Sequence, residues 1–510
     1  MVSIPRMIQR SSQWYADDLA LVFENKRFTF RETNARVNRL ANGLSSLGLK
    51  KGDRIASMMN NCHQRVEIEL ALCKKGFIGV NLNARNSEQE CSYIINHSEA
   101  KALIFAEEFR EIVQKIRKDI PSVRNIVFLS PKDDNEYEDL LKKSSASEPQ
   151  DELADDDLLA LAYTSGTTGK PKGVMLTHKC RHAMVMNMLM ERDIREGDVM
   201  VHVGPMSHAT GTYVLPHYLK GATNIIHSHF DPEEFLATVE KERVTTVMMV
   251  PTMVIRLLSC DVTKYTLKSL RKIMYGAAPM PVERLKEAIQ MFGNIFSQGY
   301  GLTEAPMTVA TLKERDHFVT GAEELTRRLG SVGRPYINVN VKIADEDGKE
   351  LPVGEVGEIL VKSDHLMAGY WKDLEATQEV LKGGWLYTGD VGKFDDKGFL
   401  YIVDRKKDML ISGGYNIYPK EVEDAIYKHP AVKEVTVIGI PDPEWGESVK
   451  AVVVLKEGMK ATQEDIISIC RDQLAGYKKP RSVEFVPELP KNPYGKIEKK
   501  LLREKYSRAT

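Results

Sequence analysis

The sequence predicts an α/β protein with a large multi-layer N-terminal domain, built on parallel-type sheets, and a small mobile α+β C-terminal domain. Three observations support this prediction. The chain has 510 residues, which is too long for one ordinary core. Its middle part alternates short apolar runs with longer helical patterns. Near residue 404 a charged tetrapeptide interrupts two apolar stretches, and a different order of elements follows.

Strand-length apolar runs, each closed by a turn, recur in the middle of the chain. They cover residues 158–163, 245–250 and 273–275. The last run leads into Gly276, and Pro281 then begins a helix at the first position, which proline favours. In that helix one apolar face contains Leu285, Ala288, Ile289 and Phe292. Repetition of strand, turn and helix indicates α/β layers with parallel strands.

The last hundred residues predict a separate unit. A helix is expected from Pro419 to about Tyr427, strands at 435–440, 449–455 and 483–486, and a second helix at 464–474. This αββαβ order, over about 100 residues, is typical of a small α+β domain. We therefore expect an N-terminal domain at 1–404, a hinge at 405–407 and a C-terminal domain at 408–510.

The charge composition excludes a surface that attracts polyanions. The chain has 71 Lys plus Arg against 72 Asp plus Glu, so its net charge is about neutral. No long-range field therefore attracts nucleic acid or an acidic membrane, and neither is expected as a partner. Any binding of phosphate must come from local geometry.

Cysteine usage and the N-terminus predict a cytoplasmic protein. The six cysteines are scattered without a CxxC pair, which indicates neither a disulfide framework nor a zinc site. Residues 1–15 lack the apolar core of a signal peptide. No apolar run approaches the roughly 20 residues that span a bilayer, so we expect no membrane span.

The segment at residues 164–173 has the composition of a phosphate-binding loop. It contains three glycines, four hydroxyl side chains and two lysines, after a predicted strand and before a helical pattern from about His178. Glycines let backbone amides converge on an anion, and the hydroxyls and lysines add donors and charge. It is not the GxxxxGK[ST] loop, because Gly166 and Gly169 are too close together. By composition alone, a flexible surface turn stays an alternative.

The string TSGTTGKPKG at these positions resembles the nucleotide loop of the adenylate-forming superfamily. That superfamily contains acyl- and aryl-CoA synthetases, peptide-synthetase adenylation domains and firefly luciferase. Further motifs resemble the family in the same order. They are YGLTE at 300–304, YTGD at 387–390, DRKK at 404–407 with ISGGYN at 411–416, and KNPYGK at 491–496. The resemblance extends from Thr164 to Lys496 and favours the acyl-CoA synthetase (fatty-acid–CoA ligase) branch.

The resemblance implies a set of residues for ATP. Thr303 is placed to contact the α-phosphate, and Asp390 to accept hydrogen bonds from the ribose hydroxyls. Lys496 is the implied catalytic lysine, although by composition alone it would be a solvated tail residue. Glu304 is the implied Mg²⁺ ligand, with Thr164 as a further one. The whole implied ATP set is Thr164, Ser165, Gly166, Thr167, Thr168, Gly169, Lys170, Lys172, Gly276, Ala277, Ala278, Gln298, Gly299, Tyr300, Gly301, Thr303, Asp390 and Arg405.

The same resemblance implies where the other substrates bind. His208 is expected beside the acyl group as a catalytic gate, although a lone histidine is more often structural. Gly301 stands where acetate-specific relatives have tryptophan, so the pocket is expected to admit a long or ring-shaped apolar acid. The implied acyl wall is His208, Thr212, Tyr213, Leu215, Gly301, Pro306 and Met307; the implied hinge is Lys407; and the implied coenzyme A contacts are Gly413, Gly414 and Tyr415.

Taken together, the sequence predicts an ATP- and Mg²⁺-dependent ligase with coenzyme A as co-substrate. It would form acyl-AMP and pyrophosphate from a medium or long fatty acid or an alicyclic or aromatic acid, and then acyl-CoA and AMP. Two alternatives stay open: transfer of the acyl group to the pantetheine of a carrier protein, and a non-catalytic nucleotide sensor. The sequence also leaves open whether the chain forms a homodimer.

Overall fold

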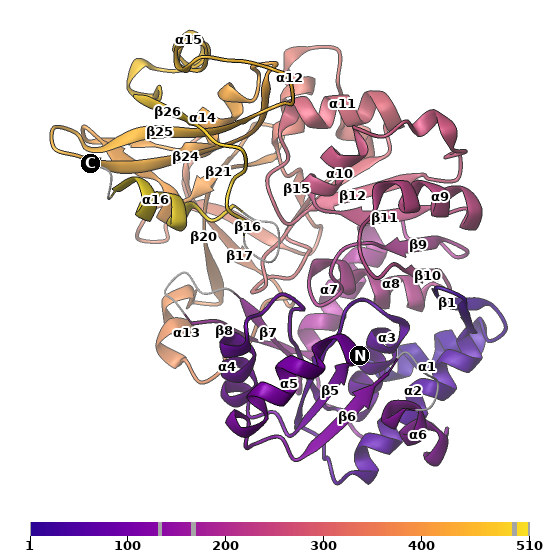
Figure 1. The fold of residues 1–510 in the computed structure, drawn as a ribbon. Helices are drawn as coiled ribbons and strands as arrows, with labels where there is room; N and C mark the ends of the chain where they lie inside the picture. Colours follow the sequence, from indigo (N-terminus) through magenta and orange to yellow (C-terminus); the bar gives the residue numbers. More distant parts are fainter. Residues whose placement is uncertain (1, 131–134, 165–169, 492–496, 508–510) are drawn as a thin grey trace.

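The computed structural model describes residues 2–130, 135–164, 170–491 and 497–507. Figure 1 shows a large N-terminal part, coloured indigo to orange, and a smaller C-terminal part in orange and yellow beside it. Four sheets with flanking helices form these parts. The predicted fold class, mixed α/β with parallel sheets in a large domain and a smaller second domain, is confirmed.

The first sheet has seven strands in the order β18-β8-β7-β4-β3-β5-β6, and β7, β4, β3, β5 and β6 run parallel. Its inner strands are almost continuous apolar runs, because helices cover both faces of a parallel sheet. The strands are β3 (Arg54–Met58), β4 (Ile78–Asn81), β5 (Ala102–Ala106), β6 (Asn125–Leu129), β7 (Leu158–Thr164), β8 (Lys172–Thr177) and β18 (Gly369–Tyr370).

The second sheet has nine strands in the order β15-β14-β13-β12-β11-β9-β10-β1-β2, with a parallel centre and antiparallel edges. Figure 1 shows its magenta and pink strands beside the indigo and purple first sheet. The strands are β1 (Leu19–Phe23), β2 (Lys26–Thr29), β9 (Val199–His202), β10 (Thr223–Ile226), β11 (Thr246–Met249), β12 (Lys272–Gly276), β13 (Phe296–Tyr300), β14 (Ala310–Leu312) and β15 (Arg334–Pro335).

A third, antiparallel sheet leads to the C-terminal domain. Its order is β16-β17-β20-β19, with β21 on the free side of β20. The strands are β16 (Asn340–Ala344), β17 (Gly357–Lys362), β19 (Leu381–Lys382), β20 (Trp385–Phe394) and β21 (Leu400–Arg405). The predicted hinge, 405–407, thus consists of the last residue of β21 and the first two residues of a 3₁₀ turn (Lys406–Asp408).

The α-helices among the described residues pack on these sheets and, in the last three cases, on the C-terminal sheet. They are α1 (Ile4–Trp14), α2 (Phe30–Ser46), α3 (His63–Lys75), α4 (Glu88–Ser98), α5 (Arg110–Ile116), α6 (Glu136–Lys143), α7 (His178–Glu191), α8 (Val214–Leu219), α9 (Pro232–Glu242), α10 (Pro251–Leu257), α11 (Val282–Phe292), α12 (Glu323–Arg327), α13 (Leu374–Val380), α14 (Pro419–Ile426), α15 (Gln463–Gln473) and α16 (Lys499–Ser507).

The predicted strands at 158–163, 245–250 and 273–275 are confirmed as β7, β11 and β12. One local prediction was wrong: Pro281 is the residue before α11 and not its first residue, because its ψ of 128° keeps it extended. The helix expected from about His178 is confirmed as α7. Sequence reasoning missed β8, which lies between the glycine-rich segment and α7 and pairs antiparallel with β7. The apolar residues 174–176 were the overlooked signal for this strand.

The C-terminal domain follows the predicted αββαβ order, in α14, β24 (Val432–Asp442), β25 (Gly446–Leu455), α15 and β26 (Ser482–Phe485). Sequence reasoning missed the hairpin of β22 (Leu410–Ser412) and β23 (Tyr415–Ile417), and helix α16. The buried carboxylate of Asp404 links the domain to β21. It accepts hydrogen bonds from the backbone N–H of Arg405 at 2.7 Å and of Lys420 at 3.0 Å, in the first turn of α14.

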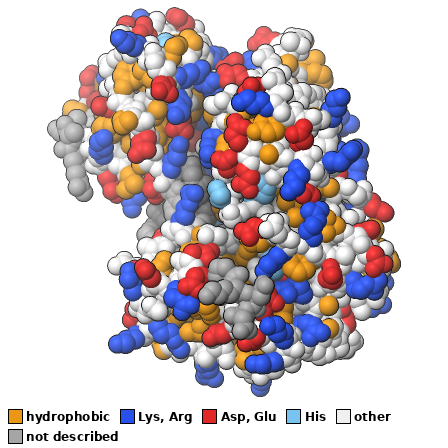
Figure 2. Space-filling model, turned by 45° about the vertical axis from the view of Figure 1, so that its right-hand side comes forward, with side chains coloured by type: hydrophobic (Ala, Val, Ile, Leu, Met, Phe, Trp, Pro, Cys, Tyr) orange, Lys and Arg blue, Asp and Glu red, His pale blue; other side chains and the backbone are white. Residues whose placement is uncertain are grey.

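Surface features agree with the charge composition. On the face shown in Figure 2, Lys and Arg side chains are interspersed with Asp and Glu. All six cysteines lie in the described residues, and all are free thiols. Within the described ranges, no helix is long and apolar enough to cross a bilayer.

Candidate active site

A cavity of about 910 Å³ lies where strand ends of the first two sheets meet the third sheet and the hinge. It gathers predicted residues that are up to 243 positions apart in the chain, from Thr164 to Lys407. Those that line it are Thr164, Lys172, His208, Thr212, Ala277, Ala278, Gly299, Gly301, Thr303, Glu304, Pro306, Met307, Arg405 and Lys407. Ligands of open α/β sheets bind in such crevices outside the carboxyl ends of strands.

The base of the phosphate loop is held by the β7–β8 hairpin. Thr164 pairs with Lys172 across the two strands. The Lys172 ammonium lies 5.1 Å from the centre of the Tyr370 ring and 3.8 Å from Asp373 Oδ2. Ser165, Gly166, Thr167, Thr168 and Gly169 lie outside the described residues, as does Lys496. Lys170 borders a second hollow of about 490 Å³, together with Tyr93, His97 and Trp371.

Small residues form one wall because two strands approach closely there. Gly276 of β12 is opposite Gly299 of β13, and a Cβ on Gly276 would overlap the carbonyl oxygen of Gly299. A Cβ on Gly299 would in turn overlap the guanidinium of buried Arg192. Ala277 follows with φ of 66°, a left-handed conformation that is strained for a residue with a Cβ. The residues of this segment that line the cavity, Ala277, Ala278 and Gly299, therefore carry little or no side chain, as the resemblance implies for an adenine site.

Asp390 is buried and held from two sides. It accepts a hydrogen bond from the Tyr300 hydroxyl at 2.7 Å on Oδ2, and Arg405 Nε lies 3.2 Å from Oδ1. The burial of Tyr300, followed by the charge of Asp390, raises the pKa of this phenol well above its ordinary value. Each carboxylate oxygen has two lone-pair directions, so both keep acceptor capacity, but Asp390 lies beneath the cavity lining and only its neighbours Thr388 and Gly389 belong to that lining.

Glu304 presents a carboxylate to the cavity beside the phosphate loop. One oxygen, Oε1, accepts a hydrogen bond from the Tyr370 hydroxyl at 2.8 Å, which orients the group. Among the described residues no cluster of three or more His, Cys, Asp or Glu side chains could hold a metal. A single oriented carboxylate fits Mg²⁺, which takes one or two protein oxygens and completes its shell with water and substrate phosphates.

The loop that carries His208 is fixed by Asn61, which sequence reasoning missed. The Asn61 side chain accepts the N–H of Met206 at 2.8 Å, and its amide donates to Gly204 O at 2.8 Å and His227 O at 3.1 Å. Asn61 follows β3 at the carboxyl edge of the first sheet, and this position was the available signal. Gly211 cannot carry a side chain, because a Cβ would overlap Met206 O.

The implied acyl wall is only partly at the cavity. Tyr213 and Leu215 are buried in the core, 1% exposed each, because the 3₁₀ turn Ala209–Tyr213 and helix α8 direct them away from the lining. Gly301 lines the cavity, but a Cβ there would lie 2.5 Å from the backbone nitrogen of Met307. The missing side chain at Gly301 therefore makes room for the 305–307 turn, in which Met307 has φ of 59°.

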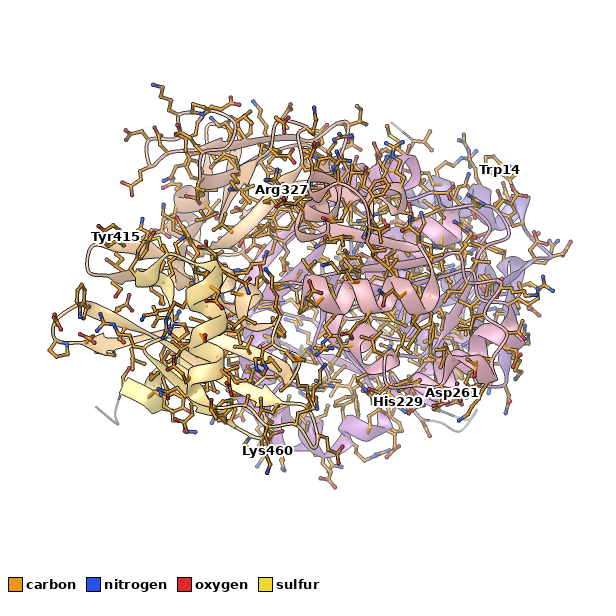
Figure 3. All side chains as sticks on the ribbon, turned by 90° about the horizontal axis from the view of Figure 1, so that it is seen from above. Trp14, His229, Asp261, Arg327, Tyr415 and Lys460 are labelled. Atoms are coloured by element: carbon orange, nitrogen blue, oxygen red, sulfur yellow. The ribbon has the colours of Figure 1, made fainter. Side chains whose placement is uncertain are left out.

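Other implied residues lie beneath or outside the cavity lining. Gln298 and Tyr300 belong to β13 under the wall. Gly413 and Gly414 form the turn between β22 and β23, where a Cβ on Gly413 would meet the Trp445 ring. Tyr415 is 58% exposed, and Figure 3 shows it at the edge of the C-terminal domain. Lys407 does line the cavity, and its burial, followed by the charge of Arg405, lowers its pKa.

Comparison with known proteins assigns the chain to a family. The model of the AMP-binding enzyme family matches residues 8–371, and that of the AMP-binding enzyme C-terminal domain matches residues 421–496. A feruloyl-CoA synthase from Amycolatopsis sp is 39% identical over 482 residues, 94% of each chain. A long-chain-fatty-acid–CoA ligase from Bacillus subtilis is 35% identical and covers 98% of this chain and 94% of its own. ATP-bound MatB from Rhodopseudomonas palustris superposes with a TM-score of 0.91 at 31% identity, over 99% of each chain.

The chain belongs to the AMP-binding enzyme family. The resemblance noted from the motifs, to the acid–CoA ligase branch of the adenylate-forming superfamily, is thereby confirmed. The protein is an ATP-dependent acid–thiol ligase.

In this AMP-binding enzyme, Gly276→Ala should disturb the wall formed by β12 and β13. The added methyl group would overlap Gly299 O, and overpacking of this kind costs about 1–3 kcal/mol. Urea unfolding should show the lower stability, and ATP should bind more weakly. Gly476→Ala is the matched control, because no atom lies within 4 Å of its Cβ position. Equal stability of the two variants would contradict the close approach.

His208 of the AMP-binding enzyme should titrate below the ordinary histidine pKa of about 6.5. His208 keeps an exposed surface, but it stands in the cavity lining, and partial desolvation of its imidazole by the protein around it lowers its pKa. The neutral form should therefore persist as the pH falls through 6.5, and the charge should appear only at more acidic pH. NMR titration of labelled histidines, with the His208 signal assigned from His208→Gln, measures this. A midpoint at or above 6.5 would exclude it.

Proposed function

We propose that this enzyme condenses a carboxylic acid with ATP to an acyl-adenylate, releases pyrophosphate, and then transfers the acyl group to the thiol of coenzyme A. The observation that carries the proposal is the composition of one cavity. The base of the phosphate loop, the oriented carboxylate of Glu304 and the hinge cations Arg405 and Lys407 all line it. The related feruloyl-CoA synthase and fatty-acid–CoA ligase support the same chemistry.

The first half-reaction must bring two anions together, since a carboxylate attacks the α-phosphate of ATP. The barrier is mainly electrostatic, and preorganised positive charge and donors lower it most. Lys172 and Arg405 are two cations of the cavity lining. Thr303 adds a hydroxyl to the same lining. These groups suit the binding and orientation of a triphosphate.

Mg²⁺ and Lys496 complete the proposed machinery. Glu304, with Thr164 as a further ligand, would hold Mg²⁺, which supplies positive charge to the phosphates. Lys496 would bridge the acid and the α-phosphate; this role rests on its motif at 491–496, since the residue lies outside the described part of the chain. Asp390 would accept the ribose hydroxyls from its buried position.

For the acid we propose a medium or long fatty acid, or an alicyclic or aromatic acid. Pro306, Met307 and Ala277 give the cavity apolar lining near Thr303 and His208. Such lining favours the hydrocarbon part of an acid. Relatives of similar identity carry the names of an aromatic and of a long-chain acid, so they support the whole range and do not narrow it.

Coenzyme A is the favoured acceptor, and carrier-protein pantetheine is the alternative. Gly413, Gly414 and Tyr415 sit on an exposed hairpin whose Tyr415 ring stacks on Tyr477 at 4.7 Å. A rotation of the C-terminal domain about Lys407 would present this hairpin to the cavity, a movement of the kind that separates two half-reactions. Two CoA ligases among the relatives support coenzyme A over a carrier protein and over a non-catalytic sensor.

A pyrophosphate-release screen tests the proposal. The enzyme receives ATP, Mg²⁺ and acids of graded length and ring content, with coenzyme A or with a pantetheine-bearing carrier protein. We expect release of pyrophosphate with at least one acid, and an acyl thioester with coenzyme A. Absence of pyrophosphate over the whole panel would favour the sensor, and acylation of the carrier alone would favour the alternative acceptor.

Lys496→Ala should abolish adenylate formation and spare thiolation of supplied acyl-adenylate, because only the first step needs the bridging ammonium. The loss of rate should be about 10²–10³-fold, as for removal of one donor at an oxyanion site. Stopped-flow or quench assays of the two half-reactions measure it. Lys500→Ala is the control, an exposed lysine of the same segment. Equal losses in both half-reactions would refute the assignment.

Lys407→Pro should slow thiolation more than adenylation, by about tenfold or more in the ratio of the two rates, because a fixed φ stiffens the hinge. Lys407→Ala separates this effect from loss of the charge, since it removes the ammonium and leaves the backbone free. A ratio that stays at the wild-type value in Lys407→Pro would exclude position 407 as the hinge.

A further inference from the structure

Part of the cavity lining is polar and consists of residues to which neither ATP nor the reacting carboxyl group has been assigned. They are Glu69 of α3, Asn81 at the end of β4, Asn83 just after it and Arg181 of α7. We call these four residues the polar end. All of them come from the first sheet and its helices, whereas Ala277, Pro306 and Met307 come from the loops of the second sheet.

The polar end contains buried hydrogen-bond donors without partners. Arg181 Nη1 and Asn83 Nδ2 are shielded from solvent and have no hydrogen-bond partner among the described residues. Asn83 is only 4% exposed, and its Oδ1 already accepts the N–H of Arg85 at 2.9 Å. Unpaired buried donors cost folding free energy, so such groups in a native protein call for a ligand, a water or an ion as partner.

A third donor points to the same conclusion. Asn81 Oδ1 accepts the hydroxyl of Ser57 at 2.7 Å, so the acceptor side of this amide is occupied within the protein. The amide nitrogen of Asn81 is then the group left for a ligand, because Asn81 lines the cavity. Asn81 is exposed, so its amide adds an accessible N–H donor beside the two buried ones, and the acceptor oxygens of Asn81 and Asn83 are already used.

The charge of the polar end is balanced. Arg181 Nη2 lies 3.4 Å from Glu69 Oε1, and the two side chains are 12% and 20% exposed. A ligand that carries a carboxylate or phosphate would be attracted by the Arg181 guanidinium but repelled by the Glu69 carboxylate beside it. A hydrocarbon would leave the donors of Arg181 and Asn83 unpaired and dehydrated. A neutral group with an accepting oxygen avoids both penalties.

We infer that the polar end is a second substrate subsite, which binds a neutral group with a hydrogen-bond-accepting oxygen: a carbonyl, amide, ether or hydroxyl oxygen. The inference rests on the proposed function, because the ligand must be part of a substrate of this reaction. Two substrates have such chemistry: an acid with an oxygen substituent remote from its carboxyl group, and the thiol acceptor with amides in its arm. Arg181 acts here as a specificity-determining residue.

The test compares Arg181→Met with wild type in the two half-reactions. Without coenzyme A, adenylate formation is measured for pairs of acids of equal length, one with a distal ether or ketone oxygen and one with a methylene in its place. With a fixed acid, thiolation is measured for coenzyme A and for a short thiol without amides. Arg39→Met is the matched control, since Arg39 donates to Leu141 O and Ser144 O and does not line the cavity.

If the acid is the ligand, the wild-type preference in kcat/KM for the oxygen-bearing acid should fall about tenfold in Arg181→Met, with kcat for the methylene acid unchanged. If the thiol arm is the ligand, KM for coenzyme A should rise about tenfold and the short thiol should react as before. Either result supports the subsite and shows whether its ligand belongs to the acid or to the thiol acceptor. Arg181→Lys, which keeps the charge beside Glu69, should show the same change to a smaller extent and carries the test if Arg181→Met does not fold.

Two results would overturn the inference while the proposed function stands. Substrate preferences and thiol KM within twofold of wild type in folded variants of Arg181 would mean that the donors hold only water. A gain for acids with a second carboxylate, lost in Arg181→Met, would mean that the subsite is anionic and not neutral. Failure of the proposed function is distinct, because wild type itself would then release no pyrophosphate with any acid.

Discussion

The carboxylate of Asp390 joins the parts of the molecule on which the site depends. It accepts the hydroxyl of Tyr300 from β13 and pairs with Arg405 at the end of β21, while it belongs itself to β20. The second sheet, the third sheet and the entry to the C-terminal domain therefore meet at one buried charge. Loss of either partner would leave a buried carboxylate short of a partner, which is costly, so Tyr300, Asp390 and Arg405 couple these parts of the molecule.

In this protein the local placement of cations, and not the overall charge, can attract an anionic substrate. The chain is close to neutral, so an anionic substrate gains little from the field at long range. The cavity instead places Lys172 at the base of a glycine-rich hairpin and Arg405 and Lys407 at the hinge. Lys172 and Arg405 are partly removed from water there, so their interactions are stronger than those of fully solvated charges, whereas Lys407 stays exposed. Glu304, whose carboxylate is oriented by Tyr370, suits one divalent ion in the same cavity.

The two sheets contribute differently to the cavity. The second sheet supplies a flat wall, where Gly276 and Gly299 approach so closely that no side chain fits, and where Ala277 and Met307 adopt left-handed conformations. The first sheet supplies the phosphate hairpin and the polar end with Arg181, Asn81 and Asn83. The loop that carries His208 also lines the cavity, and a hydrogen bond from Met206 to Asn61 holds it. A flat, strained wall suits a rigid planar group, and a donor-rich end suits a flexible neutral one.

The sequence by itself determined the α/β class, the order of elements in the C-terminal domain and the motifs of the family, because these are local: periodicity, turn residues and short strings are read within a few positions. It could not show that β8 pairs antiparallel with β7, that Tyr213 faces the core, or that Asn61 holds the His208 loop. Those facts depend on which distant strands pair and which side of a turn meets solvent. Only the tertiary structure decided them, since the contacts that settle each one join residues far apart in the chain.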